Sequence, residues 1–244
     1  MILDFRSDTF TKPTKEMLEV MFQAEVGDDV FEEDPTINRL EALASSLFGM
    51  EAGLFCSSGT QTNQIAINIH TKPGDDIICD QQAHIHYYEG GGIAANSGAS
   101  VSLLAGKRGL VTSDQVKDAI QVDNVHFPRT SLVALENTAN KGGGSIYEMD
   151  TISEIKSICV EHNLGFHLDG ARVFNAVVER QYTAEDLGNK FDSISVCLSK
   201  GLGAPVGSVL LGTKEFIHQA RRVRKRFGGG MRQAGYLAAA GIYA

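Results

Sequence analysis

The sequence has little of what marks membrane, secreted or nucleic-acid-binding proteins. No uninterrupted apolar run approaches the length of a membrane span, and Asp4 and Arg6 interrupt any signal-like stretch near the N-terminus. The four cysteines form no CxxC pair and no zinc-ribbon spacing, so we expect reduced, mostly buried thiols. Basic residues number 22 against 30 acidic ones, and the net charge of −8 gives no positive field that would hold nucleic acid. These absences favour a cytoplasmic protein that acts on a small molecule.

Length and composition are those of a folded globular protein. The chain has 244 residues, of which 43% are hydrophobic and 21% are charged, unlike disordered, collagen-like or coiled-coil sequences. A chain of this length predicts one large domain. Glycine is the one unusual count, because 26 of 244 residues is about 11%, above the usual ~7%.

Short β-like runs alternate with helical patterns along most of the chain. The runs cover residues 77–79, 100–104, 131–135, 164–168, 193–198 and 208–211. Helices are predicted at 17–22, 37–48, 114–120 and 152–162. Thr151 and Glu154 have the spacing of a capping box for the last helix, whereas the acidic segment 27–34 is predicted to be a loop. The alternation predicts an α/β fold with a largely parallel sheet covered by helices, in which ligands bind beyond the carboxyl ends of the strands.

Charged side chains follow two of the predicted strands. Asp169 comes directly after the run 164–168 and is followed by Gly170, Ala171 and Arg172. Lys200 follows the run 193–198 between small residues, a setting that suits a lysine that forms a Schiff base. A carboxylate and an amine are therefore expected at the ligand-binding edge of the sheet.

Two further segments complete a recognisable set. Ser58, Gly59 and Thr60 precede a helix, so their hydroxyls and backbone N–H groups can cradle a phosphate at the positive end of the helix dipole. His84 follows the run 77–79 and could lie over a planar ring. A phosphate cradle, a stacking histidine, a strand-end aspartate and a strand-end lysine are together what a protein must supply to pyridoxal phosphate.

At this point the sequence resembles a known family, the low-specificity threonine aldolases. Six segments carry the resemblance: DFRSDT at 4–9, GDDVF at 27–31, SGTQTN at 58–63, HLDGAR at 167–172, SKGLG at 199–203 and GGGMRQ at 228–233. This family belongs to the pyridoxal-phosphate enzymes of aspartate-aminotransferase fold, in the group named for threonine aldolases and β-eliminating lyases. The similarity runs through nearly the whole chain, so the resemblance implies a large cofactor-binding domain over residues 1–244.

The resemblance implies roles for residues around one site. Lys200 would hold the cofactor as an imine, Asp169 would pair with the pyridine nitrogen and His84 would stack on the ring. Ser58, Gly59 and Thr60 would hold the phosphate of the cofactor. Ser7 and Arg172 would bind the substrate carboxylate, and Arg172 would also contact the cofactor. Residues 1–35 would contribute to the active site and to subunit contacts. In the homotetramers of this family, Phe31, Lys225 and Arg232 would enter a neighbour's site, where Arg232 would contact the cofactor.

The implied reaction is retro-aldol cleavage of L-threonine or L-allo-threonine to glycine and acetaldehyde, a step of threonine catabolism and glycine biosynthesis. Either His84 or His126 could help to remove the β-hydroxyl proton. Alternatives are β-elimination or racemisation on the same site, or a truncated, non-catalytic homologue. Two departures from the family are visible: Phe31 stands where tyrosine is common, and the chain stops at Ala244, whereas relatives continue for roughly another hundred residues into a small domain.

Two other patterns have simpler interpretations. His84 and His86 form an HxH pair that would share one face of a strand, but no third ligand with zinc spacing is evident, so no metal site is expected. The run 221–226 contains five cations in six residues, the best argument for nucleic-acid binding. Against the overall charge, a solvated helix face or a subunit contact is favoured.

Overall fold

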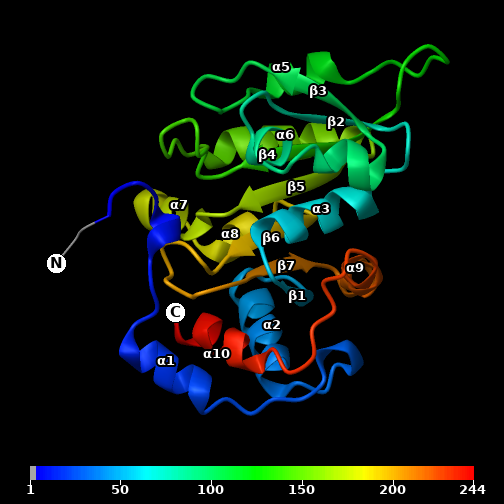
Figure 1. Cartoon of the computed structure of the whole chain (residues 1–244). Coiled ribbons are helices and arrows are strands. Elements are labelled where there is room, and N and C mark those ends of the chain that lie inside the picture. Colours follow the sequence, from blue (N-terminus) through cyan, green and yellow to red (C-terminus); the bar gives the residue numbers. More distant parts are fainter. Residues whose placement is uncertain (1–3) are drawn as a thin grey trace.

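A computed structural model describes residues 4–244, which form one seven-stranded sheet flanked by helices (Figure 1). The strands are β1 (Ala52–Cys56), β2 (Asp76–Asp80), β3 (Ser100–Leu104), β4 (Thr130–Glu136), β5 (Gly165–Gly170), β6 (Ser193–Cys197) and β7 (Ser208–Gly212). The helices are α1 (Lys15–Phe22), α2 (Pro35–Leu47), α3 (Gly59–His70), α4 (His84–Tyr87), α5 (Ser113–Ala119), α6 (Met149–Glu161), α7 (Val173–Arg180), α8 (Ala184–Gly188), α9 (Lys214–Arg226) and α10 (Gly235–Tyr243). The predicted α/β fold is confirmed.

The strand directions bring the carboxyl ends of most strands to one edge of the sheet. The order is β1-β7-β6-β5-β4-β2-β3, and β7 pairs antiparallel with β1 and with β6, whereas the remaining pairs are parallel. Every strand except β7 therefore runs in the same direction. In Figure 1 their carboxyl ends face left, where α7 follows β5 and the N-terminal segment passes. Sheets of this kind bind ligands at that edge.

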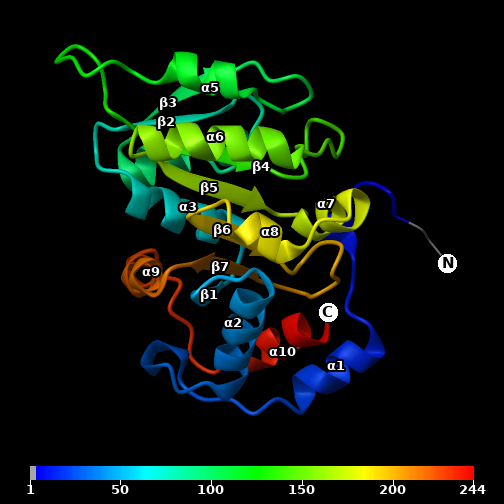
Figure 2. The ribbon, with the colours of Figure 1, turned by 180° about the vertical axis from the view of Figure 1, so that it is seen from behind.

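Helices cover both faces of the sheet. Along β1, Leu54 and Cys56 pack in a hydrophobic cluster with side chains of α3 and α9, whereas Phe55 between them packs in the larger cluster on the other face. Figures 1 and 2 show α3 in front of the sheet and α6 and α8 behind it. Strands β2, β4, β6 and β7 are buried along their whole length. The centres of β2, β4 and β7 are short apolar runs, as is usual for strands covered on both faces, whereas β6 alternates serine with apolar residues.

Two local predictions differ from the structure. The capping box at Thr151 and Glu154 was wrong, because α6 begins at Met149 and Glu148 is its N-cap, without a side-chain bond. Glu154 instead accepts a hydrogen bond from Ser113 Oγ at 2.7 Å. Strand β1 was not predicted, since it opens with alanine and glycine, which have weak β propensity.

The acidic segment 27–34 is a loop around a short helical turn, but it is anchored in the interior. Asp29 and Arg224 are 1% and 3% exposed, and their side chains form an ion pair at 2.8 Å. Arg221 pairs with the buried Glu41 at 2.6 Å. The basic run 221–226 is therefore not a wholly solvated helix face, because two of its cations are consumed in ion pairs with buried carboxylates.

The four cysteines are free and buried, as predicted. Burial raises the pKa of the Cys56 thiol to about 12, which keeps it protonated and unreactive at neutral pH. Across residues 4–244, no helix is both long and apolar enough to span a bilayer.

Candidate active site

Asp169 lies near the carboxyl end of β5 and is buried. Its Oδ1 accepts a hydrogen bond from Ala171 N at 3.1 Å, and its Oδ2 accepts one from Asn63 Nδ2 at 2.9 Å. Two N–H donors on the two oxygens fix the plane of the carboxylate. Asp169 is thus a buried, oriented acceptor at the ligand-binding edge.

Lys200 lies just beyond the end of β6, the parallel neighbour of β5. Its Nζ donates to Cys197 Sγ at 3.1 Å, and Thr11 Oγ1 donates to the Lys200 carbonyl oxygen at 2.8 Å. A Cβ atom added at Gly201 or Gly203 would meet no atom within 4 Å. The Lys200 amine is therefore held at the sheet edge, and the loop that carries it has unoccupied space beside Gly201 and Gly203.

The N-terminus of α3 reaches the same place. Ser58 is the N-cap of this helix, because its Oγ accepts a hydrogen bond from Gln61 N at 3.2 Å. A Cβ atom on Gly59 would approach Cys197 Sγ to 2.6 Å, so only glycine fits here. Cys197 Sγ also accepts from Lys200, so the positive end of the helix and the lysine ammonium converge around one sulfur atom. Such a convergence suits a phosphate group bound by the backbone of Gly59 and Thr60.

His84 begins the short helix α4 and is oriented by a carboxylate that sequence reasoning missed. Its Nδ1 lies 2.9 Å from Oε1 of the buried Glu89. The hydrogen bond to Glu89, aided by the charges of Asp169 and Glu136, raises the pKa of His84. Glu89 also accepts from Asn63 Nδ2 at 2.9 Å, which links the histidine to Asp169. No sequence pattern predicts the contact between Glu89 and His84, because Glu89 lies beyond the end of the helical turn that contains His84.

Glu136 supports the same group from the end of β4. One carboxylate oxygen accepts from His84 N at 2.9 Å and the other from Asn140 N at 2.8 Å. Burial and the neighbouring charge of Asp169 raise the pKa of Glu136 to about 7. Glu136 therefore fixes the backbone at His84.

Arg172 lies just after β5 and joins the N-terminal segment to the site. Its Nε and Nη2 donate to the two oxygens of Asp8, at 2.6 and 2.8 Å. The Arg172 guanidinium lowers the pKa of the Asp8 carboxyl. Ser7 precedes Asp8 and caps the turn that carries it. The structure thus brings Ser7 and Arg172 into one neighbourhood, with Asp8 between them.

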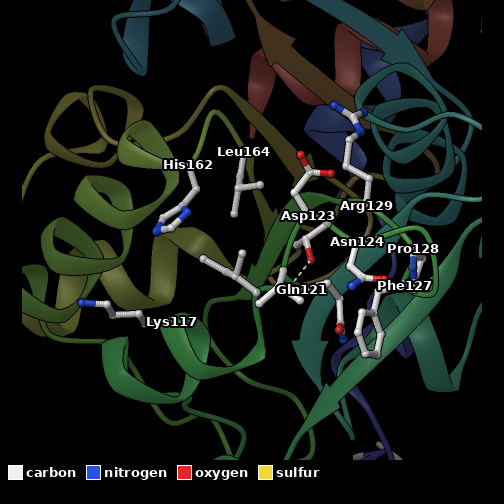
Figure 3. Close-up of a pocket in the computed structure, with 12 residues that line it drawn as sticks. Lys117, Gln121, Asp123, Asn124, Phe127, Pro128, Arg129, His162 and Leu164 are labelled. Carbon is white, nitrogen blue, oxygen red and sulfur yellow. Dashed lines mark hydrogen bonds between the residues drawn. The ribbon is translucent and has the colours of Figure 1, made fainter.

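His126 is not brought into this cluster. It lies in the segment between α5 and β4, which is at the upper right in Figure 1, whereas the carboxyl ends of the strands face left. Its backbone N–H donates to Asn124 Oδ1 at 3.0 Å. The same segment borders a cavity of about 640 Å³ beside the amino ends of β4 and β5, shown in Figure 3. Of these two candidate bases, His84 is the one that lies near Asp169.

Phe31, Lys225 and Arg232 form a second group apart from Lys200. Arg232 Nη1 donates to Asp28 Oδ2 at 2.7 Å, and Phe31 is 68% exposed. Lys225 lies near the end of α9, next to Gly230, at a cavity of about 350 Å³. In Figure 1, α9 lies at the right, beyond the end of β7, opposite the edge that carries Lys200.

The HxH pair lies on the helical turn α4 and not on a strand, so the predicted geometry was wrong. His84, Glu89 and Asp169 do offer ligand atoms that lie within 4.8 Å of one another. Asn63 Nδ2 donates to both carboxylates, so N–H hydrogens point where a cation would have to bind. The group is therefore a hydrogen-bonded cluster around Asn63.

An amine at Lys200, a buried carboxylate at Asp169 and the N-terminus of α3 at Gly59 form the kind of site found in α/β enzymes of the pyridoxal-phosphate-dependent class. Residues 4–244 match the family described as beta-eliminating lyase. The chain belongs to this family of threonine aldolases and β-eliminating lyases.

Named relatives agree with this assignment. The chain is 45% identical over 244 residues to the low specificity L-threonine aldolase of Escherichia coli strain K12, and the match covers 100% of this chain and 72% of that protein. It is 42% identical to the probable low-specificity L-threonine aldolase of Schizosaccharomyces pombe, over 98% of this chain and 64% of that protein. The fold matches that of Leishmania major threonine aldolase with a TM-score of 0.87 and 24% identity, over 97% of this chain and 70% of that one.

Proposed function

We propose that this protein cleaves L-threonine and L-allo-threonine to glycine and acetaldehyde with the help of pyridoxal 5'-phosphate. The observation that carries the proposal is the convergence of Lys200, Asp169 and the N-terminus of α3 on one sheet edge. The 45% identity to a low specificity L-threonine aldolase supports the choice of reaction.

The residues present fit the cofactor. Lys200 Nζ is the amine that would attach it, Asp169 would hold a proton at its pyridine nitrogen, and residues 58–60 would bind its phosphate. His84 would lie against the ring. When bound, pyridoxal phosphate supplies an electron sink for the pair left at the substrate Cα.

Arg172 and Ser7 would bind the substrate carboxylate. Among the contacts of residues 4–244, Asp8 engages Nε and Nη2 of Arg172, and Nη1 has no protein acceptor. When a carboxylate binds one edge of a guanidinium, it fixes the plane of the group, and the remaining N–H groups then point in a fixed direction. Asp8 therefore orients Arg172 for an incoming carboxylate.

His84 is the group that would accept the β-hydroxyl proton. Its Nδ1 is engaged by Glu89, which leaves Nε2 as the nitrogen for proton transfer. As Nε2 takes the proton, the Cα–Cβ bond breaks, acetaldehyde leaves, and the electron pair remains at Cα. A proton then returns to Cα and completes glycine.

We further propose that the working form is a homotetramer in the cytoplasm, in which residues 1–244 form the large cofactor-binding domain. The segments that carry Phe31, Lys225 and Arg232 meet at a place apart from Lys200, which supports a role in a neighbour's site. The contacts of Asp8 with Arg172 and of Thr11 with Lys200 support a role for residues 1–35 in the active site. Four free cysteines suit a reducing compartment.

The test is product analysis. The purified chain, supplied with pyridoxal phosphate, should release acetaldehyde and glycine in equal amounts from L-threonine and L-allo-threonine. Lys200→Ala should abolish the release and the visible absorption of the covalently attached cofactor, while the far-UV circular dichroism is unchanged. Release of ammonia without acetaldehyde would replace the proposal with β-elimination. A cofactor-loaded chain that transforms neither substrate would contradict the proposal altogether.

A further inference from the structure

We propose that Asn63 and His167 are positioning residues, which hold Asp169 through a chain of buried hydrogen bonds that begins at His70. The inference rests on the proposed function, because Asp169 matters through its contact with the cofactor. It adds residues that touch neither substrate nor cofactor.

Asn63 bridges two carboxylates. Its Nδ2 lies 2.9 Å from Asp169 Oδ2 and 2.9 Å from Glu89 Oε1, and the residue is 1% exposed. Ionised carboxylates only accept hydrogen bonds, so both hydrogens of Nδ2 are used and the orientation of the amide is determined. Asn63 Oδ1 must then accept a hydrogen bond from the group on its other side.

That group is the fully buried His167. Its Nε2 lies 3.1 Å from Asn63 Oδ1, and its Nδ1 lies 2.8 Å from Ser193 Oγ. Burial lowers the pKa of His167 to about 3, so the ring is neutral at pH 7 and carries one N–H. Because Asn63 Oδ1 can only accept, the proton is on Nε2, and Nδ1 accepts from the Ser193 hydroxyl.

His70 supplies the first donor. Its Nε2 lies 2.9 Å from Ser193 Oγ, and burial lowers the pKa of His70 to about 4. Since the Ser193 hydroxyl hydrogen points to His167, the oxygen must accept from His70 Nε2–H. A Cβ atom on Gly165 would approach His70 Nδ1 to 2.6 Å, so this ring lies where only glycine leaves room for it.

The register of the sheet explains how this chain of hydrogen bonds is assembled. Gly165, His167 and Asp169 occupy every second position of β5 and therefore face the same side of the sheet. His167 lies opposite Ser193 on β6. Asn63 and His70 are two turns apart on α3, so they lie on one helix face above that strip. Each of the four successive hydrogen bonds from His70 to Asp169 is donated in the direction of Asp169, and hydrogen bonds aligned in one direction strengthen one another.

The direction of these hydrogen bonds determines how they are expected to act on Asp169. The donor end of this chain of hydrogen bonds holds the Asp169 carboxylate in one orientation. An ionised Asp169 can keep the pyridine nitrogen of the cofactor protonated. A purely packing role for the same residues would not depend on which nitrogen of His167 carries the proton.

The experiment pairs two substitutions of His167 in the full-length chain. His167→Gln keeps an N–H donor for Asn63 Oδ1, whereas His167→Phe removes it. With ¹⁵N-labelled pyridoxal phosphate, we expect His167→Phe to weaken cofactor binding about tenfold and to lower the pH at which the pyridine nitrogen loses its proton. His167→Gln should stay within about threefold of the wild type. Phe166→Leu, on the other face of β5, is the packing control and should lower stability without changing either property.

Histidine ¹⁵N chemical shifts of the unmodified chain provide a measurement that needs no variant to fold. We expect His167 and His70 to be neutral and protonated at Nε2 at pH 7. Protonation of His167 at Nδ1, or equal cofactor binding and pyridine protonation in His167→Phe and wild type, would overturn the inference. A wild-type chain that takes up no pyridoxal phosphate would instead overturn the proposed function.

Discussion

Arg172 Nε and Asp8 Oδ2 lie 2.6 Å apart, and a second bond of 2.8 Å from Nη2 to Oδ1 makes the ion pair bidentate. Arg172 precedes α7, just after β5, and Asp8 belongs to the N-terminal segment, which passes α7 in Figure 1. The pair fixes the plane of the guanidinium proposed to bind the substrate carboxylate. Asp8 thus links the first residues of the chain to substrate binding.

Replacing Asp8 by asparagine should loosen this arrangement. Asparagine offers one acceptor oxygen and no charge, so the guanidinium loses one charge-assisted bond and its fixed plane. We expect the KM for L-threonine to rise about tenfold, with a smaller change in kcat. Asp4→Asn is the matched control, because Asp4 pairs locally with the exposed Arg6. Equal KM values for the two variants would contradict the role given to Asp8.

Glu89 should set the pH range over which His84 acts as a base. The Glu89 carboxylate raises the pKa of His84, and a base works only above its own pKa. Glu89→Gln removes the charge, so the acidic limb of the kcat/KM profile should move to lower pH. The plateau should fall about tenfold, because the ring becomes a weaker base and its hydrogen bond to residue 89 is no longer charge-assisted.

Glu148→Gln provides the control for this profile, since Glu148 is largely exposed and pairs with Arg180 on the surface. Its pH–rate profile should coincide with that of the wild type. An acidic limb that stays in place in Glu89→Gln, or moves to higher pH, would show that Glu89 does not govern the titration of His84.

The parts of the site that follow strands could be predicted, and the parts that depend on packing could not. Asp169 and Lys200 follow apolar runs, and a parallel sheet brings such positions to one edge whatever the details of the fold. Glu89 and His167 act through hydrogen bonds between α3, β5 and the segment after α4, and these partners are determined only when the helix is placed on the sheet.

The same limit applies to the basic run 221–226 and to its partners in the acidic loop. Asp29 and Arg224 both lie in charged segments of the kind usually found on the surface. Only the folded path of the chain brings the two residues together in the interior. Local patterns report propensity and amphipathicity. They do not report which distant ion will neutralise a buried charge.

The pair of Asp29 and Arg224 should be one of the most sensitive points for stability. Arg224→Met leaves Asp29 buried without its cation, and we expect the free energy of unfolding to fall by about 3–5 kcal/mol. The double variant with Asp29→Asn should recover a large part of the loss, because it removes the uncompensated charge. Urea denaturation of the single and double variants measures both effects.

Arg222→Met is the control within the same helix, since Arg222 is exposed. It should change the free energy of unfolding by less than about 0.5 kcal/mol. A loss in Arg224→Met no greater than in Arg222→Met, or no recovery in the double variant, would show that the buried pair contributes little.

Gly59 tests whether the N-terminus of α3 and Lys200 share one site. A methyl group at this position would overlap Cys197 Sγ, the atom that accepts a hydrogen bond from Lys200. Gly59→Ala should therefore push the first turn of α3 away from the lysine and weaken pyridoxal-phosphate binding by at least about tenfold. Adding Cys197→Ala removes the sulfur and should restore part of the affinity. The dissociation constants come from fluorescence titration of the cofactor-free chain. Unchanged affinity in Gly59→Ala, or no recovery in the double variant, would mean that the phosphate is not bound at this helix end.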